Sequence, residues 1–181
     1  VPAVGVTTDA SVNAYVVADP LGVEQSQIVF TEGALRVMEL IELEGFIAAC
    51  LARVKSGRLE LQTETAGVVA ALGKFIPAGL ARKALEACFT QQDVFDADLK
   101  ACGITRFPPG LIAAYEKMSA ESTVTSGVNP LNVHLWLANP KSAFSPNSSN
   151  ASGRDASSST VIGSEVVHPA LATRLALLRS I

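Results

Sequence analysis

The side chains best suited to catalysis or metal binding are few and widely spaced in this chain of 181 residues. The histidines are His134 and His168, and the cysteines are Cys50, Cys88 and Cys102. Structural zinc sites are held by tight pairs of such residues, and this sequence has no such pairs. We therefore predict no metal site, no cofactor and no catalytic residue. We interpret the cysteines as free thiols that pack in the core of a protein from a reducing compartment.

Motifs of the common enzyme classes are missing from the sequence. It has no HExxH, CxxC, GxGxxG, P-loop or GxSxG pattern. Carboxylates do cluster at Asp93, Asp96 and Asp98, where a divalent ion or a glycosidase could use them. We place them instead in the first turns of a helix, where negative charge is favourable. The prediction is that the protein is not an enzyme.

Lysine and arginine side chains are the remaining candidates for binding, because they neutralise phosphate groups. Serines and asparagines around Arg154 would add hydrogen bonds to phosphate. The candidate contacts to a nucleic-acid backbone are Arg53, Lys55, Arg58, Arg82, Lys83, Arg106 and Arg154. Each of them equally fits a solvated surface. Aromatic residues make up only 6% of the chain, which argues against a platform for base stacking.

These residues need elements to position them, and the patterns predict a mainly α fold. We expect a small helical bundle with an extended N-terminal arm and a polar, Ser/Asn-rich loop before a C-terminal helix. The expected divisions are an arm over 1–30, a helical core over 31–118, a polar linker with a short extended segment over 119–163, and a helix over 164–181. Helices are predicted over 31–57, 65–75, 80–89, 90–103 and 108–118, and from 169 to 181, with alternating residues at 133–137.

The composition is unusually apolar for a protein with so few charges. Hydrophobic residues are 49% and charged residues 17%, with a net charge of −3, against about 25% charge in a typical domain. The most apolar stretch, Leu35–Val54, contains charged residues that exclude a membrane span. No basic segment opens the chain, so we predict no secretory signal. The apolar excess favours burial against copies of the same chain.

Three short motifs resemble those of helical plant RNA virus coat proteins, rod-shaped or filamentous. They are Glu39-Leu40-Ile41-Glu42-Leu43, Leu61-Gln62-Thr63 and Arg106-Phe107-Pro108, and they occur in that order. The resemblance implies a helical bundle with an extended arm and a polar loop at the nucleic acid. It also implies a role for Arg106 at the RNA.

The hypothesis is a self-assembling structural subunit, a coat or nucleocapsid protein that packages single-stranded RNA through backbone contacts. Its partners would be copies of itself and RNA, with no membrane, and its location the virion and the host cytoplasm. The alternative is a small helical module that binds an apolar ligand or a protein partner. That ligand would lie among Phe46, Phe75, Phe89, Phe95 and Phe107.

Overall fold

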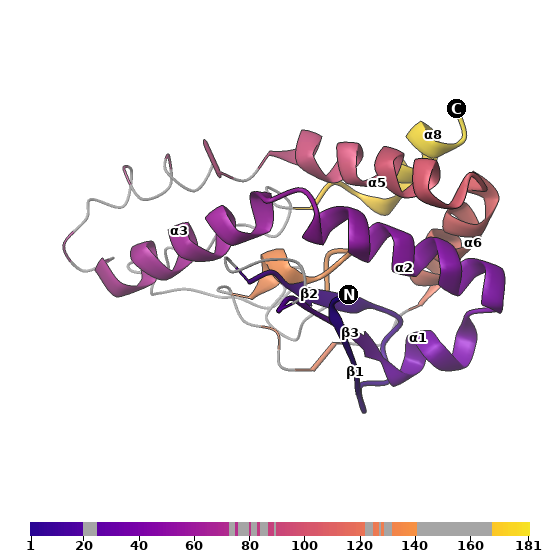
Figure 1. Cartoon of the computed structure of the whole chain (residues 1–181), viewed down its shortest axis with the longest axis horizontal. Helices are drawn as coiled ribbons and strands as arrows, with labels where there is room; N and C mark the ends of the chain where they lie inside the picture. The colour runs from indigo at the N-terminus through magenta and orange to yellow at the C-terminus, as the bar shows by residue number, and fades with distance from the viewer. Residues whose placement is uncertain are drawn as a thin grey trace, which may run out of the picture.

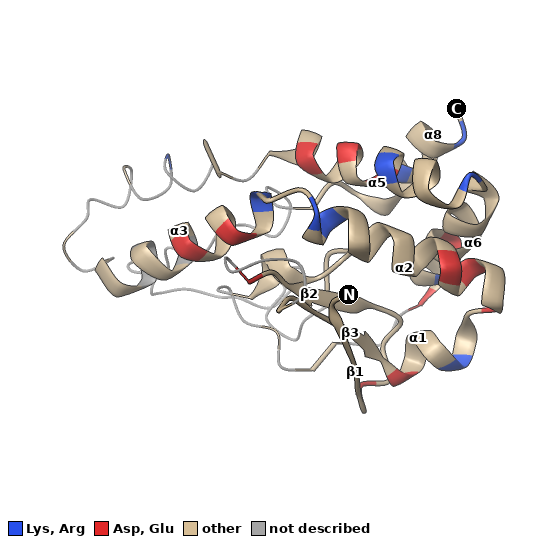
Figure 2. Cartoon of the chain, viewed as in Figure 1, with Lys and Arg blue, Asp and Glu red and all other residues tan. Residues whose placement is uncertain are grey.

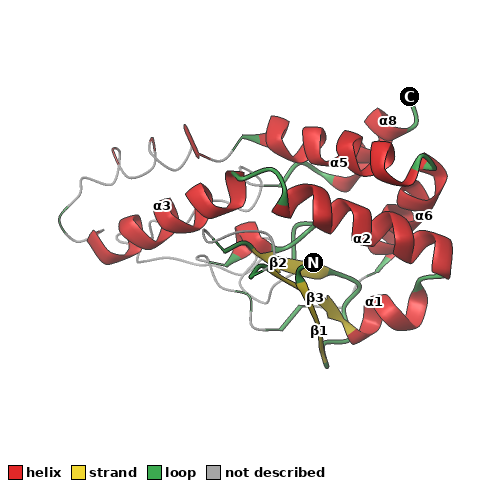
Figure 3. Ribbon diagram, in the orientation of Figure 1, coloured by secondary structure: helices red, strands yellow, loops and turns green. Residues whose placement is uncertain are grey.

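The computed structural model of the chain describes residues 1–19, 25–72, 75, 80, 83, 87–88, 90–121, 125–126, 128, 132–140 and 168–181. Within these ranges the protein is mainly helical, as predicted, and a small sheet lies against the helices (Figure 3). The polar loop expected at 142–160 lies outside the described residues, as does most of the helix expected at 80–89. The domain boundaries stay a prediction.

The N-terminal residues form a sheet rather than an extended arm. Strands β1 (Ala3–Thr7), β2 (Ala14–Val17) and β3 (Gln27–Thr31) lie in the order β1-β3-β2. β1 runs parallel to β3, and β2 runs antiparallel to it. Val16, Ile28 and Phe30 are buried on one face of the sheet. The arm prediction was wrong because each strand is too short to be stable alone, but the three pair with one another and pack on a helix.

The long helix predicted over 31–57 is two helices, α1 (Glu32–Val37) and α2 (Leu40–Val54). Thr31 caps α1 as predicted, because its hydroxyl accepts a hydrogen bond from the amide of Ala34 at 3.3 Å. A new helix starts after Glu39, whose amide donates to the Glu42 carboxylate at 2.7 Å. This hydrogen bond belongs to a capping box, which favours a helix start at that point.

Helix α2 lies at the centre of the molecule, packed against β2 of the sheet and against α3 (Arg58–Leu72), α5 (Gln91–Thr105) and α6 (Pro108–Ala120) (Figure 1). The last helix, α8 (Leu171–Leu178), packs on α5 and α6. The backbones of α2 and α6 touch where they cross. A Cβ atom on Gly45 would lie 2.6 Å from the Leu111 nitrogen, and one on Gly110 would lie 2.6 Å from the Ile41 carbonyl oxygen. The absence of a side chain at Gly45 and Gly110 therefore permits this close contact.

Residues 133–137 form a turn instead of the extended segment that their alternating pattern indicated. A 3-10 helix, η1 (Val133–Leu135), is followed by an isolated bridge between Trp136 and Tyr15 of β2. The alternating pattern does not correspond to alternating burial, because Val133, His134, Trp136 and Leu137 are all buried. Among the described residues, no helix combines the length and the apolar character that crossing a bilayer would need.

Candidate functional site

The two edges of the sheet differ. At the β2 edge, residues 136–138 run alongside the strand: the Leu137 amide donates to the Ala14 carbonyl at 2.8 Å, and Trp136 bridges to Tyr15. The Asn13 side chain extends this pairing, because its amide nitrogen donates to the Ala138 carbonyl at 3.1 Å. The β2 edge is therefore already paired.

The β1 edge is open within the described part of the chain, since no described strand pairs with its outer side. Ala3 donates to the Ser26 carbonyl at 2.9 Å, so its backbone groups point inward to β3. Successive residues of a strand point their backbone groups to alternate sides. The N–H and C=O groups of Val4 and Val6 therefore point outward. Their side chains are also exposed, to 67% and 60%, although the register places them on the same face as buried Ile28 and Phe30.

A pocket of about 390 Å³ lies where β1 ends. Its walls come from the end of β1, from β2, and from the segment around η1. The lining residues are Thr7, Thr8, Asp9, Tyr15, Ser126, Asn132, Leu135 and Trp136. The rings of Tyr15 and Trp136 form a tilted pair with centroids 5.1 Å apart. The pocket thus combines aromatic surface with hydroxyl, amide and carboxylate groups next to the open strand.

Asp9 is the charged group of this pocket. One carboxylate oxygen, Oδ1, accepts a hydrogen bond from the Ser11 amide at 2.8 Å, and Oδ2 accepts one from the Ser126 amide at 2.6 Å. Burial by itself would raise the pKa of Asp9, but the hydrogen bonds from Ser11 and Ser126 outweigh it and hold this pKa below 3.8. The carboxylate is therefore ionised at neutral pH.

The loop that carries Asp9 is fixed to the start of α1. The Asp9 carbonyl accepts a hydrogen bond from the Gly33 amide at 3.0 Å. A Cβ atom at position 33 would lie 2.1 Å from the Ala10 carbonyl oxygen, so only glycine fits there. The hydroxyl of Thr31 also donates to the Asn13 carbonyl at 2.7 Å. These contacts hold Asp9 at the pocket wall.

A second buried carboxylate, Asp98, lies in the interior and has a different set of partners. Arg174 of α8 donates from Nε and Nη2 to its two carboxylate oxygens, each at 2.7 Å. The Tyr115 hydroxyl donates to Asp98 at 2.6 Å and accepts from Arg174. All three side chains are almost completely buried. Asp98, predicted in the first turns of a helix, lies further along α5, and its contacts with Tyr115 and Arg174 join α5, α6 and α8.

The two histidines are also interior residues. His134 Nε2 lies 3.0 Å from the Thr63 hydroxyl, and His168 Nε2 lies 2.8 Å from the Val133 carbonyl oxygen. Burial, together with the nearby charge of Arg53, lowers the pKa of His134 to about 4 and that of His168 to about 3. Both imidazoles are therefore neutral at pH 7. They stabilise the fold around 132–137 and do not line the pocket beside β1.

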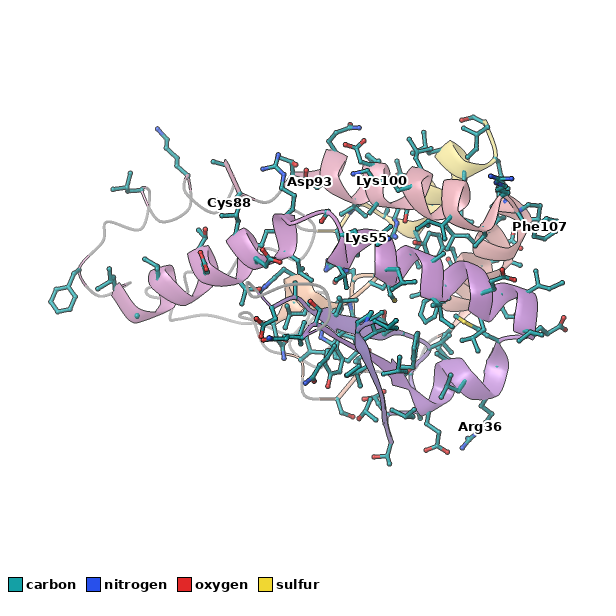
Figure 4. The ribbon with its side chains drawn as sticks, viewed as in Figure 1. Arg36, Lys55, Cys88, Asp93, Lys100 and Phe107 are labelled. Carbon is teal, nitrogen blue, oxygen red and sulfur yellow. The ribbon has the colours of Figure 1, made fainter. Side chains whose placement is uncertain are left out.

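The candidate nucleic-acid residues do not share one environment. Arg53 is buried, and its guanidinium donates to the Trp136 carbonyl and, at 2.6 Å, to the His134 carbonyl. A phosphate cannot reach it there, so the structure corrects this assignment. Lys55 is exposed, and so is Arg58, whose Nε lies 3.2 Å from the Asp93 carboxylate. Figure 4 shows Lys55 at the end of α2 and Asp93 at the start of α5.

The other candidates are spread over the chain. Lys83 and Arg106 are exposed, whereas Arg82 and Arg154 lie outside the described residues. Basic residues in the described part are distributed over several helices (Figure 2). Nucleic-acid contact by Lys55, Arg58, Lys83 and Arg106 stays a prediction.

The alternative apolar-ligand site is not assembled. Phe46 is fully buried and packs on Phe30 with ring centroids 5.8 Å apart, whereas Phe75 and Phe107 are 84% and 50% exposed. Phe95 is partly buried, and Phe89 lies outside the described residues. The described phenylalanines therefore do not line one cavity between the helices. Within the described ranges, no three His, Cys, Asp or Glu side chains gather as metal ligands.

Sequence reasoning missed the pocket. Its residues come from 7–9, 15, 126 and 132–136, and no spacing links these segments. The signal that was available was local: two hydroxyl residues and a carboxylate, Thr7, Thr8 and Asp9, directly follow alternating valines at 4 and 6. Polar residues that follow a strand are candidates for a binding site, but only pairing with β3 makes Val4–Thr7 a strand.

Comparison with known proteins finds relatives that are named as proteases. The chain is 26% identical over 170 residues to a protein named Protease HtpX homolog from Dictyoglomus thermophilum, and the match covers 77% of this chain and 55% of that relative. A protein of the same name from Dictyoglomus turgidum is 27% identical over 173 residues, covering 78% of this chain and 56% of the relative. The chain therefore spans just over half the length of these curated relatives. No family model matches the chain, and no solved structure is significantly similar to it.

These relatives overturn the functional hypothesis drawn from the sequence. They are proteins of cellular organisms and are named as proteases. The resemblance to viral coat proteins, the role as a coat subunit, and the location in a virion and host cytoplasm were therefore wrong. The prediction that the protein is not an enzyme was wrong on the same finding. The short motifs misled because each spans only three to five residues.

Proposed function

We propose that this protein takes part in proteolysis and that the outer edge of β1 holds a polypeptide substrate in extended conformation. The observation that carries the proposal is the open strand with a pocket at its end, in a chain whose curated relatives are named proteases. An extended peptide adds naturally to a free strand edge, where main-chain hydrogen bonds supply affinity and pockets supply specificity.

The backbone of β1 is suited to this pairing. Val4 and Val6 each direct one donor and one acceptor outward, as the inward contact of Ala3 implies. Their exposed side chains offer apolar surface beside the added strand. The opposite edge is closed by residues 136–138, so pairing is directed to β1.

Side chains of the peptide would alternate between the two faces of the extended sheet. On the face away from α2, the register aligns Gly5 with Val29 and Tyr15, and Thr7 follows. Because Gly5 has no side chain, the surface of this face is recessed at the centre of β1. The side chain of Tyr15, on β2, adds bulk to the same face. A peptide side chain directed to this face near Thr7 would enter the pocket.

The first test is cleavage. The purified protein is incubated with denatured, fluorescently labelled casein, and the fragments are identified by mass spectrometry. We expect fragments to appear with time and with protein concentration. A wild-type protein that binds labelled peptides but leaves all of them intact would overturn the hydrolytic part of the proposal.

The second test removes one outward donor from β1. Val6→Pro deletes the N–H group that faces outward and keeps the bonds to β3, since proline is tolerated on the free side of an edge strand. Val6→Thr is the matched control, because it keeps the N–H group and a β-branched side chain. We expect Val6→Pro to weaken peptide binding about tenfold, because a lost hydrogen bond costs about 1 kcal/mol or more. Equal binding by the two variants, measured by fluorescence polarisation, would place the substrate elsewhere.

A further inference from the structure

The pocket beside β1 has a negative charge that no described residue of the chain neutralises. The described ion pairs are Arg36–Glu32, Arg58–Asp93, Lys117–Glu42, Arg174–Asp98 and Arg179–Glu116. None of them includes Asp9, and the residues that line the pocket include no lysine, arginine or histidine. The Asp9 carboxylate therefore lies at a pocket wall without a cationic partner from the described residues.

We propose, resting on the proposed function above, that this pocket receives the side chain of a lysine or arginine from an extended polypeptide. The argument is one of complementarity. A carboxylate that is taken partly out of water favours a positive charge close to it, and here the space beside it is a cavity rather than a protein side chain.

The hydrogen bonds of Asp9 leave room for such a partner. Its two oxygens accept one backbone amide each, from Ser11 and from Ser126. An ionised carboxylate has about four lone-pair positions. These amides fix the orientation of the carboxylate and leave acceptor capacity for an ammonium or guanidinium group.

The aromatic side of the pocket suits the rest of the same side chain. Tyr15 and Trp136 are inclined at 58° to each other. Aromatic faces attract cations, and the methylene stem of lysine or arginine packs well on apolar surface while its charged end reaches a polar group. Thr7, Thr8 and Asn132 bring further oxygen atoms to the lining. An acidic side chain would find no cation in this lining.

The position of the pocket connects it to the strand edge. Thr7 is the last residue of β1, and Thr8 and Asp9 follow it directly. A peptide paired with Val4 and Val6 would pass the pocket at this end. The preference would therefore concern one position of the bound peptide, and not its overall charge.

The test compares labelled extended peptides that differ at one position, which carries Lys, Arg, Met or Glu. We expect the Lys and Arg peptides to bind about fivefold more tightly than the Met peptide, the size of effect that a partly exposed ion pair supports, and the Glu peptide to bind most weakly. The preference should shrink as ionic strength rises.

Three variants, one of them a control, test whether the preference arises at this pocket. Thr8→Lys adds a positive charge to the lining at an exposed residue and should remove the preference for Lys and Arg over Met. Val68→Lys adds the same charge on α3, where Val68 is 53% exposed, and should retain the preference. Asp9→Asn should also remove it, with circular dichroism as the check on folding.

The outcomes separate the two proposals. Peptides that bind at β1 with equal affinity for Lys, Met and Glu would overturn the cation pocket and leave the proposed function standing. A preference that survives Thr8→Lys unchanged would also overturn the pocket assignment. If no peptide binds at all, both proposals fail.

Discussion

Two of the buried carboxylates in the described part of the chain, Asp98 and Asp9, are satisfied in different ways. Asp98 lies between α5, α6 and α8, where it receives two hydrogen bonds from Arg174 and one from Tyr115. Asp9 lies at a pocket wall and receives one amide from Ser11 and one from Ser126. Asp98 is neutralised inside the fold by Arg174, whereas none of the described residues supplies a cation to Asp9.

The different partners of the two carboxylates suit different roles. Asp98 contributes to the stability of the fold, whereas Asp9 is placed to recognise a ligand. The ion pair of Asp98 and Arg174 is 1% exposed on both sides, so no ligand can reach it. The Arg174 guanidinium also lies 4.3 Å from the centre of the Tyr115 ring, which adds a cation–π contact. The burial of Asp98 therefore explains how α8 is attached to the bundle. Asp9 is held by hydrogen bonds from Ser11 and Ser126 rather than by a described cation, and it lines a pocket that a ligand can enter.

The largest effect is expected when the interior pair is broken. Asp98→Asn leaves the Arg174 charge buried without its counter-ion, which costs about 3–5 kcal/mol of unfolding free energy. Asp9→Asn leaves no buried cation behind and should cost about 1–3 kcal/mol, the range for a lost charge-assisted hydrogen bond. Urea unfolding of the two isosteric variants measures the difference.

A double variant checks the cause of the larger loss. Asp98→Leu with Arg174→Met removes both charges and should recover much of the stability, because well-packed apolar residues often replace a buried ion pair without loss. Equal destabilisation by Asp98→Asn and Asp9→Asn would contradict the distinction between the two carboxylates.

The next effect concerns the buried histidines, which lie near the same interior charges. His168 is close to Arg53, Arg174 and His134, and burial keeps its pKa at about 3 against 6.5 in the unfolded chain. Below pH 6.5 the unfolded chain binds a proton that the folded chain does not, so stability falls as the pH falls. Between pH 7 and pH 5 we expect a loss of about 2 kcal/mol for each histidine, since 1.5 pH units correspond to about 2 kcal/mol.

Urea unfolding at several pH values tests this. His168→Gln should flatten the pH dependence between 7 and 5 by about half, with His134 responsible for the remainder. The carboxyl of Asp9 affects the pH dependence of stability only below pH 5, because its pKa is lowered from 3.8 in the folded protein. A stability that is constant from pH 7 to pH 5 would show that the histidines take up protons in the folded state.

The last prediction tests how the loop that carries Asp9 is held against Gly33. Gly33→Ala places a Cβ atom against the Ala10 carbonyl, so the Asp9 loop must move, at a cost of about 1–3 kcal/mol for overpacking. Gly67→Ala is the control, because nothing lies within 4 Å of a Cβ atom at that position in α3. It should stabilise the helix by about 0.5–1 kcal/mol. If Gly33→Ala also stabilises the protein, the loop is not held as the structure shows.

Much of the helical fold was predictable because the helices carry local signals. Thr31 caps α1, and α6 begins at Pro108, where proline suits the first turn. The break between α1 and α2 also has a local signal, Glu39 with Glu42, but the apolar pattern continues across it and favoured one long helix. The side chain of Lys117, from distant α6, fixes this break by donating to the Val37 carbonyl at 3.0 Å and to Glu42 at 2.6 Å.

The candidate site was less predictable because its parts meet only in three dimensions. The Asp9 oxygen partners include Ser126, which is 117 residues away in the chain, and Tyr15 meets Trp136 across a similar separation. Arg53 was assigned to the surface from its charge, but the interior provides two carbonyl acceptors for its guanidinium. Its burial lowers its pKa only to about 10, so it remains charged at neutral pH.

The amino-acid sequence by itself determined the mainly helical class, the positions of most helix starts, and the surplus of apolar residues over charged ones, because caps, prolines and periodicity act between neighbouring residues. Tertiary structure alone decided that the N-terminal segments form a sheet, that no described strand pairs with the outer side of β1, and that Asp98 has a described cation beside it while Asp9 has none. Hydrogen-bond partners and burial depend on which distant segments meet, and no spacing along the chain specifies that.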